Sequence, residues 1–263
     1  MYAFQYHRPS SLVDAAKLIT GDAKLLAGGH TLIPTMKQRL ANPSALIDLS
    51  GIAELRGIQK STAGIVIGAM TTHDEVANSP VVRSAIGGLC DVAASIGDPH
   101  VRNRGTIGGS LANNDPAADY PAAALALGAT IATNRREIKA DDFFTGLFST
   151  ALGEGEIIVS IALPMPTKFA YVKFANPASR YALVGVAVAQ TSGGPRVAVT
   201  GAGNNGVFRH KGMEAALAKE WSVQSLAGLA ANASDMMNDM HADAAYRAHL
   251  VGVLAKRAVT KAG

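Results

Sequence analysis

The first part of the chain alternates between helical and strand-like spacing of its apolar residues. Between residues 11 and 21 they recur every three to four positions, which predicts a helix with one buried face. Residues 24–27 form a short apolar run typical of a buried strand, residues 31–40 predict a short helix and residues 44–49 a second strand. We therefore expect a small β-α-β-like unit over about residues 1–52.

The middle of the chain has shorter elements separated by glycine. In order, the pattern predicts a strand at 64–68, a capping box at 72–75, a helix at 80–96, a polar loop at 97–105, a helix from Asp119 to Gly128, a strand at 129–132, a helical turn at 141–144 and a strand at 156–163. Pro164 and Pro166 close the last strand, because proline cannot continue a strand ladder. This proline pair is the clearest domain boundary in the sequence.

The last third predicts an antiparallel sheet followed by helices. Strands are expected at 169–175, 181–190 and 196–201, with a hairpin turn at 192–195, and helices at 223–237 and 242–261. Strands and helices that are segregated in this way indicate an α+β fold for the whole chain.

Composition narrows the function classes. The chain has 263 residues, of which 48% are apolar and only 17% charged, so it can form large cores and leaves surface that a partner subunit could cover. The net charge is +4, but the basic residues are scattered. The densest set, Arg102-Asn103-Arg104, lacks interleaved aromatic residues, so no nucleic-acid partner is expected. This segment is either a solvated turn or an aid to binding an anion.

A single cysteine, Cys90, lies among apolar residues and is expected to be a buried structural thiol. One cysteine cannot form an internal disulfide or hold an iron–sulfur cluster alone, which fits a reducing compartment. No basic segment followed by an apolar core precedes the fold, and the longest apolar run, 121–132, is too short to span a bilayer. We expect a cytoplasmic protein without a membrane span.

Two glycine pairs are the most informative local feature. Gly28-Gly29 follows the strand at 24–27, and Gly108-Gly109 follows the polar loop. Glycine lets the main chain approach a ligand closely, and consecutive backbone N–H groups in such a turn can bind an anion. Two such turns could hold one diphosphate from two sides, although isolated glycine pairs are usually only tight turns. Neither fits a GxGxxG fingerprint or a P-loop.

Acid–base machinery is sparse. The sequence has no Ser-His-Asp arrangement with a nucleophile elbow, no HExxH and no metal-ligand cluster, so no catalytic or metal residue is predicted. The histidines are scattered; His30 and His100 are the best-placed candidates for a base. Asp119 is either a helix cap or a ribose acceptor, and Lys173 and Tyr181 are either packing residues or cofactor contacts.

In combination these segments are recognisable. The run from Lys24 to Pro34, KLLAGGHTLIP, and the run from Val101 to Ala112, VRNRGTIGGSLA, together resemble the FAD-binding medium subunits of molybdenum hydroxylases, the family of aerobic carbon monoxide dehydrogenase and xanthine dehydrogenase. The resemblance extends through Asn114–Asp119 to the last helix. It implies two FAD-binding subdomains of the vanillyl-alcohol-oxidase (PCMH) type at 1–55 and 56–166, and a C-terminal α+β domain at 167–263.

The resemblance also implies the cofactor site, position by position. FAD would be held by Leu25, Leu26, Ala27, Gly28, Gly29, His30, Thr31, Leu32, Ile96, Thr106, Ile107, Gly108, Gly109, Ser110, Asp119, Ile158, Lys173 and Tyr181. The two glycine turns would take the diphosphate and Asp119 the ribose or adenine side. Ile96 and Ile158 would pack on the cofactor, and Lys173 and Tyr181 would lie near the isoalloxazine. Ser110 stands where many relatives have Asn, and both can hydrogen-bond.

In this family a large subunit hydroxylates the substrate at a molybdenum cofactor, and a small subunit carries two iron–sulfur clusters. The resemblance therefore implies an electron-transfer subunit, in a dimer of heterotrimers, that passes electrons to NAD, a quinone or oxygen. Two alternatives stay open at this point. One is a stand-alone flavin oxidase or dehydrogenase of the same fold, and the other is a scaffold subunit that no longer holds FAD.

Overall fold

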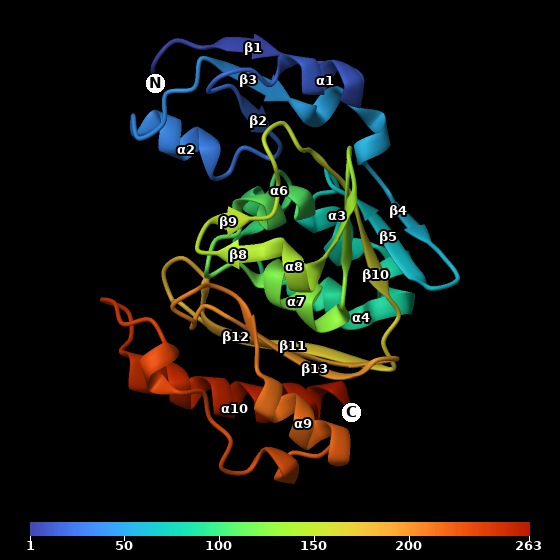
Figure 1. The fold of residues 1–263 in the computed structure, drawn as a ribbon, viewed down its shortest axis with the longest axis vertical. Coiled ribbons are helices and arrows are strands. Elements are labelled where there is room, and N and C mark those ends of the chain that lie inside the picture. Colours follow the sequence, from blue (N-terminus) through green and yellow to red (C-terminus); the bar gives the residue numbers. More distant parts are fainter.

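Three main sheets, each with its own hydrophobic core, organise the protein. The computed structural model describes residues 1–263 (Figure 1). The N-terminal sheet lies at one end of the molecule, a five-stranded sheet in the middle and a four-stranded sheet at the other end. The α+β class expected from the sequence is confirmed.

The N-terminal unit is a parallel sheet in the order β1-β3-β2. Its strands are β1 (Gln5–His7), β2 (Lys24–Leu26) and β3 (Ala45–Asp48), and its helices are α1 (Leu12–Leu18) and α2 (Leu32–Lys37). The Ser11 hydroxyl accepts from the Asp14 N–H at 3.1 Å and so begins α1. The β-α-β prediction is confirmed. Strand β1 was not predicted, because its three residues are mostly exposed and show no apolar run.

The middle sheet is antiparallel, in the order β4-β5-β10-β6-β7. Its strands are β4 (Ile58–Lys60), β5 (Gly64–Gly68), β6 (Thr130–Thr133), β7 (Glu137–Lys139) and β10 (Ile158–Pro164). A separate hairpin joins β8 (Phe144–Gly146) to β9 (Ser149–Thr150), and two 3-10 turns, η1 (Leu49–Gly51) and η2 (Ala53–Leu55), lead into the sheet. The predicted strands at 64–68, 129–132 and 156–163 are confirmed to within two residues.

Helices of the middle part cover this sheet. They are α3 (His73–Asn78), α4 (Pro80–Ala94), α5 (Pro99–Arg102), α6 (Ile107–Asn113), α7 (Asp119–Leu127) and α8 (Ala140–Phe143). The capping box is confirmed: the Thr72 hydroxyl accepts from the Glu75 N–H, and the Glu75 carboxylate accepts from the Thr72 N–H. Cys90 is fully buried in α4, as expected. The predicted polar loop contains the short helix α5, which Asp98 caps.

The C-terminal sheet lies between two layers of helices (Figure 1). Its order is β11-β12-β13-β14, all antiparallel, with β11 (Lys168–Ala175), β12 (Ala182–Thr191), β13 (Gly194–Thr200) and β14 (Phe208–Arg209). Helices α9 (Lys211–Lys219) and α10 (Ala244–Ala262) pack on one face, and α4 and α7 pack on the other. The middle and C-terminal parts therefore share helices α4 and α7 as a common layer.

One predicted helix is wrong and one real helix was missed. Residues 223–237 form only two 3-10 turns, η3 (Gln224–Leu226) and η4 (Ala233–Asp235). Gly228 between them has a φ of +73°, and the Asn232 side chain caps η4, so the apolar residues reach the core from separate turns. Helix α9 was missed because its N-cap is His210, whose ring accepts from the Met213 N–H at 3.2 Å, and histidine is not a usual cap.

No helix in the structure has both the length and the apolar character that a membrane crossing needs. The domain boundaries at 55 and 166 stay a prediction.

Candidate functional site

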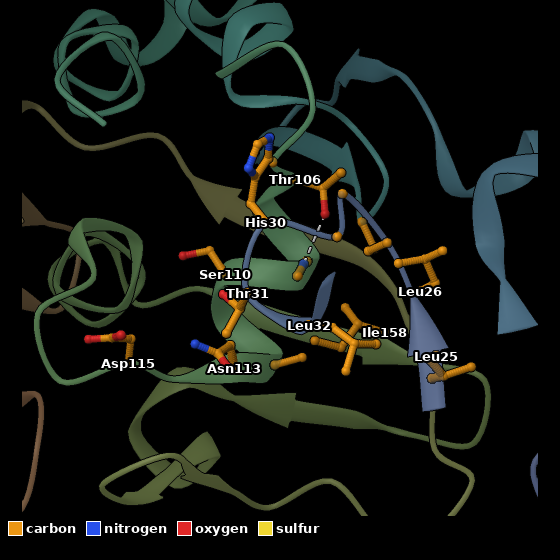
Figure 2. Close-up of a pocket in the computed structure, with 18 of the residues that line it drawn as sticks. Leu25, Leu26, His30, Thr31, Leu32, Thr106, Ser110, Asn113, Asp115 and Ile158 are labelled. Atoms are coloured by element: carbon orange, nitrogen blue, oxygen red, sulfur yellow. Dashed lines mark hydrogen bonds between the residues drawn. The ribbon is translucent and has the colours of Figure 1, made fainter. Parts of the chain in front are cut away.

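A cavity of about 880 Å³ opens between the N-terminal unit, the middle sheet and the loop that joins β11 to β12. Its walls contain every residue of the implied FAD site except Ile107 and Lys173. Figure 2 shows its centre, where the first glycine turn lies beside helix α6. Residues from Leu25 to Tyr181, more than 150 positions apart in the sequence, therefore line the same cavity.

The first glycine turn offers unused hydrogen-bond donors. The backbone N–H groups of residues 27–31 donate to no atom of the chain, and all five residues line the cavity. Residues 27–29 are half-buried and residues 30 and 31 are exposed, so all five N–H groups are free to donate to a ligand in the cavity. Consecutive N–H groups of this kind form a concave site for an anion.

The glycines of this turn are required by close contacts. A Cβ on Gly28 would lie 2.2 Å from the Arg104 carbonyl oxygen, which belongs to the segment before the second turn. Gly29 has a φ of +77°, a conformation that side chains rarely adopt. The two turns therefore touch through backbone, and any side chain at Gly28 would push them apart.

The second glycine turn uses its donors internally. Ile107 N donates to Thr71 O, Gly108 N to Ala69 O, Gly109 N to the Thr106 hydroxyl and Ser110 N to Thr106 O, at 2.9–3.1 Å. Thr106, Gly108, Gly109 and Ser110 line the cavity, whereas Ile107 is buried and does not line it. A Cβ on Gly108 would lie 2.6 Å from the Ala69 Cβ. This turn gives close packing and a smooth wall but few free amides.

An apolar patch forms the side of the cavity beyond the first turn. Leu25, Leu32 and Ile158 come together there, and Figure 2 shows the three side chains next to one another. Ile96, at the end of α4, lines another part of the wall. Apolar surface next to an anion site suits a ligand with both a charged group and ring systems.

A buried polar cluster joins the cavity to the C-terminal sheet. Asp119, 5% exposed at the start of α7, accepts from the Tyr171 hydroxyl at 2.5 Å and from the Lys173 ammonium at 3.1 Å. Lys173 also donates to Ser95 O at 2.9 Å. Burial raises the pKa of Asp119, and Lys173 and Tyr171 counteract part of that rise. Lys173 does not line the cavity, so its link to the cavity wall runs through Asp119.

Tyr171 fits because Gly185 on the neighbouring strand has no side chain. A Cβ at Gly185 would lie 2.2 Å from the Tyr171 hydroxyl oxygen. Burial raises the pKa of Tyr171, and so does the neighbouring Asp119 carboxylate, so the phenol stays protonated and donates. Tyr181, 48% exposed at the end of the loop, lines the cavity, and burial raises its pKa too.

Several wall residues were missed by the sequence analysis. They are His73, Asn113, Asp115, Glu156, Ser179 and Arg180. The Asp115 carboxylate accepts from the Ala117 N–H at 2.9 Å. No sequence signal marks the others, because their places depend on how the loops pack around the cavity.

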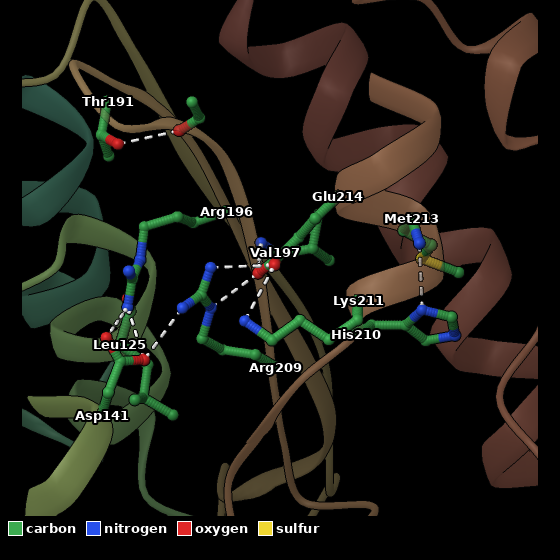
Figure 3. Close-up of polar contacts among 11 residues, drawn as sticks. Leu125, Asp141, Thr191, Arg196, Val197, Arg209, His210, Lys211, Met213 and Glu214 are labelled. Atoms are coloured by element: carbon green, nitrogen blue, oxygen red, sulfur yellow. Dashed lines mark hydrogen bonds and ion pairs between the residues drawn. The ribbon is translucent and has the colours of Figure 1, made fainter. Parts of the chain in front are cut away.

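A second polar network fastens the C-terminal sheet at a site away from the cavity (Figure 3). Arg196 makes two bonds of 2.8 Å to Asp141 and one of 2.7 Å to Leu125 O. Arg209 bridges Asp141 and Glu214, at 3.0 and 2.7 Å. The arginines belong to the C-terminal sheet and Asp141 to α8, so the network holds the middle and C-terminal parts together.

The free amide row, the apolar wall and the α+β scaffold define a protein that binds a diphosphate-containing cofactor with ring systems. Residues 2–166 match the family described as the FAD binding domain in molybdopterin dehydrogenase. The chain is 38% identical to the carbon monoxide dehydrogenase medium chain of Hydrogenophaga pseudoflava, over 98% of this chain and 96% of that one. It is 33% identical to the nicotine 6-hydroxylase medium subunit of Paenarthrobacter nicotinovorans, over 99% and 98% of the two chains.

Comparison with solved structures points to the same family as the sequence relatives. The chain superposes on a chain of reconstituted CO dehydrogenase from Oligotropha carboxidovorans with a TM-score of 0.91 and 34% identity, covering 99% of this chain and 98% of that one. For quinoline 2-oxidoreductase from Pseudomonas putida 86 the TM-score is 0.85 and the identity 30%, covering 99% and 97%. The chain therefore belongs to the FAD-binding medium subunits of the molybdenum hydroxylases. The FAD-binding fold implied by the sequence resemblance is confirmed.

Proposed function

We propose that this chain carries FAD in the cavity and transfers electrons from a partner's iron–sulfur cluster to a terminal acceptor. The observation that carries the proposal is the row of free N–H groups at residues 27–31. These groups would hold the FAD diphosphate, with Gly28 and Gly29 allowing its close approach. FAD itself would supply the redox chemistry, and the protein its position and surroundings.

The remaining walls suit the other parts of the cofactor. Leu25, Leu32, Ile96 and Ile158 offer apolar surface to its rings. Each Asp119 oxygen accepts one bond from Tyr171 or Lys173 and retains a lone pair, so a ribose hydroxyl can also donate to it. Lys173 would act on the cofactor through Asp119, and Tyr181 would lie against the isoalloxazine.

The redox partners are proposed from chemistry and from family membership. The chain has one cysteine, and it has no group of three or more His, Cys, Asp or Glu side chains placed to hold a metal ion. Iron–sulfur clusters need several cysteine ligands, so a small partner subunit would carry two of them and a large partner subunit the molybdenum cofactor. We propose a dimer of such heterotrimers. The electron-transfer direction and an acceptor such as NAD, a quinone or oxygen belong to the same proposal.

The first test is the absorbance spectrum of the purified full chain, followed by mass analysis of the cofactor that acid releases. We expect a flavin spectrum and released FAD. A colourless chain that also takes up no added FAD would overturn the proposal. In the complex purified with its partners, the compound that the large subunit oxidises should reduce the flavin and so bleach its absorbance band. Reoxidation by NAD, a quinone and oxygen, compared at equal concentration, would identify the acceptor.

A further inference from the structure

His73, which the sequence analysis did not single out, lies beneath the second glycine turn. It is the first residue of α3, it lines the cavity and it is 5% exposed. Its N–H donates to Gly105 O at 2.9 Å. A Cβ on Gly105 would lie 2.5 Å from the His73 Nε2 atom. The missing side chain at Gly105 therefore makes the space that the imidazole ring occupies.

The imidazole has no hydrogen-bond partner within the chain. Nδ1 is fully buried and unpaired. Nε2, the ring nitrogen nearest to Gly105, is not among the fully buried unpaired atoms, and it is the nitrogen left to meet a ligand in the cavity. Tyr120 packs against the ring at a centroid distance of 5.3 Å and an angle of 48°. Buried polar side chains are nearly always hydrogen-bonded, so an unpaired one in a cavity wall indicates a ligand.

The ring is uncharged at neutral pH. Burial, together with the nearby charges of His30 and Arg102, lowers the pKa of His73 to about 4. A neutral imidazole has one N–H donor and one acceptor nitrogen. An N–H donor is what a phosphate oxygen requires, and burial keeps the ring from taking up a second proton.

His73 lies next to the amide row. Gly105 follows Arg104, whose carbonyl oxygen would be 2.2 Å from a Cβ on Gly28. His30, in the amide row itself, is close enough for its charge to act on His73. The imidazole therefore stands directly behind the contact between the two glycine turns.

We propose that His73 is a cofactor-binding residue whose Nε2–H donates to the diphosphate of FAD and completes the donor set of the first turn. This inference rests on the proposed function. It assigns the buried imidazole to the diphosphate, in addition to the glycine turns that the sequence resemblance implies.

Two substitutions separate the ring nitrogens. In His73→Gln the side-chain amide reaches the position of Nε2, and in His73→Asn it reaches only that of Nδ1. The measurement is the FAD dissociation constant of the full chain stripped of cofactor, from quenching of FAD fluorescence. Losing one hydrogen bond to a charged group should weaken binding by about tenfold or more in His73→Asn. His73→Gln should stay within about threefold of the wild type.

The matched control is His100→Gln, at an exposed histidine outside the cavity, and it should bind FAD like the wild type. Equal affinities for His73→Asn and His73→Gln, or no change in either, would overturn the inference while the wild type still binds FAD. A wild-type chain that binds no FAD would overturn the proposed function together with the inference.

A second measurement needs no variant, and so it tests the inference even if a His73 substitution prevents folding. Nitrogen NMR of the wild-type chain with labelled histidine reports which ring nitrogen carries the proton. FAD should move the His73 Nε2 resonance towards that of a hydrogen-bonded N–H and should move Nδ1 less. Unchanged His73 resonances at saturating FAD would contradict the inference.

Discussion

The two glycine turns have almost the same sequence signature but different physical properties. Residues 27–31 leave every backbone N–H without a partner in the chain, whereas residues 107–110 each donate to an acceptor nearby. The first turn is half-buried at residues 27–29, exposed at residues 30 and 31 and open to the cavity, and the second lies largely within the core. A pair of glycines can thus serve either to expose donors to a ligand or to let backbone pack on backbone.

The two turns also depend on each other. Gly28 of the first turn touches the Arg104 carbonyl just before the second, so the second turn supports the first from behind. In the diphosphate site the first turn would then supply the N–H donors, and the second turn would hold the first in position without donating equally. This difference can be tested by changing one turn at a time.

The largest effect is expected for Gly28→Ala. Its Cβ would lie 2.2 Å from Arg104 O and 2.7 Å from the Gly105 Cα, so the first turn must move off its support. Strain of this kind costs about 1–3 kcal/mol, which corresponds to a loss of FAD affinity of about 5-fold to 150-fold. Flavin content after purification and the FAD dissociation constant measure it.

The control for this substitution is Gly87→Ala, a helical glycine whose Cβ would have only the Arg83 side chain nearby, at 3.8 Å. It should leave FAD binding unchanged. If Gly28→Ala retained wild-type affinity, the first turn would not be the donor site.

Gly108→Ala should act on folding more than on the ligand. Its Cβ would meet the Ala69 Cβ at 2.6 Å and the Ala69 O at 2.7 Å, inside the core. We expect the free energy of unfolding without FAD to fall by about 1–3 kcal/mol. Chemical denaturation of the cofactor-free chain measures it. An unchanged denaturation midpoint with lost FAD binding would mean that the second turn contacts the ligand directly.

Acid should loosen the wall next to the apolar patch. Hydrogen bonds from Arg136 lower the pKa of Glu156 to about 2, from an ordinary value near 4.5. Between these two values the unfolded chain binds a proton that the folded chain does not, so this contribution to stability is present above pH 4.5 and is lost as the pH falls towards 2. Glu156→Gln should be less stable at pH 7 but lose less stability on acidification. Equal pH slopes for variant and wild type would contradict this account.

The smallest effect is expected for Ser110→Ala. The Ser110 N–H already donates to Thr106 O, and only the hydroxyl is free to reach a ligand. Losing one neutral hydrogen bond should weaken FAD binding by about threefold. A loss as large as that of Gly28→Ala would remove the distinction between the two turns.

The sequence alone could not predict which of the two glycine turns leaves its N–H groups free. Both glycine pairs, the surrounding strands and the family resemblance could be read from residues 24–34 and 101–112, because local patterns determine turns and short elements. Which amides stay free depends on acceptors elsewhere in the fold, such as Ala69 O and Thr71 O for the second turn. No local pattern records those partners.

The same reason explains the other differences. Asp119 and Lys173 were expected as two separate cofactor contacts, and the fold also pairs them with each other between α7 and β11. His73 was recognised only as part of a capping box, since its burial arises from packing against Gly105 and Tyr120. Helix α9 was hidden by its unusual histidine cap, and the helix expected at 223–237 is interrupted at Gly228, whose φ is +73°.

The shared layer of α4 and α7 sets a limit on engineering this protein in pieces. A fragment that stopped at Pro166 would contain the whole matched family segment, yet it would leave Asp119 and Asp141 without their cationic partners and expose the helix faces that β11–β13 cover. A chimera with the C-terminal part of a relative would need the same side chains as Tyr171, Lys173 and Arg196. It would also need glycine at position 185, where a Cβ would collide with the Tyr171 hydroxyl. The unit that can be exchanged between relatives is therefore the entire chain.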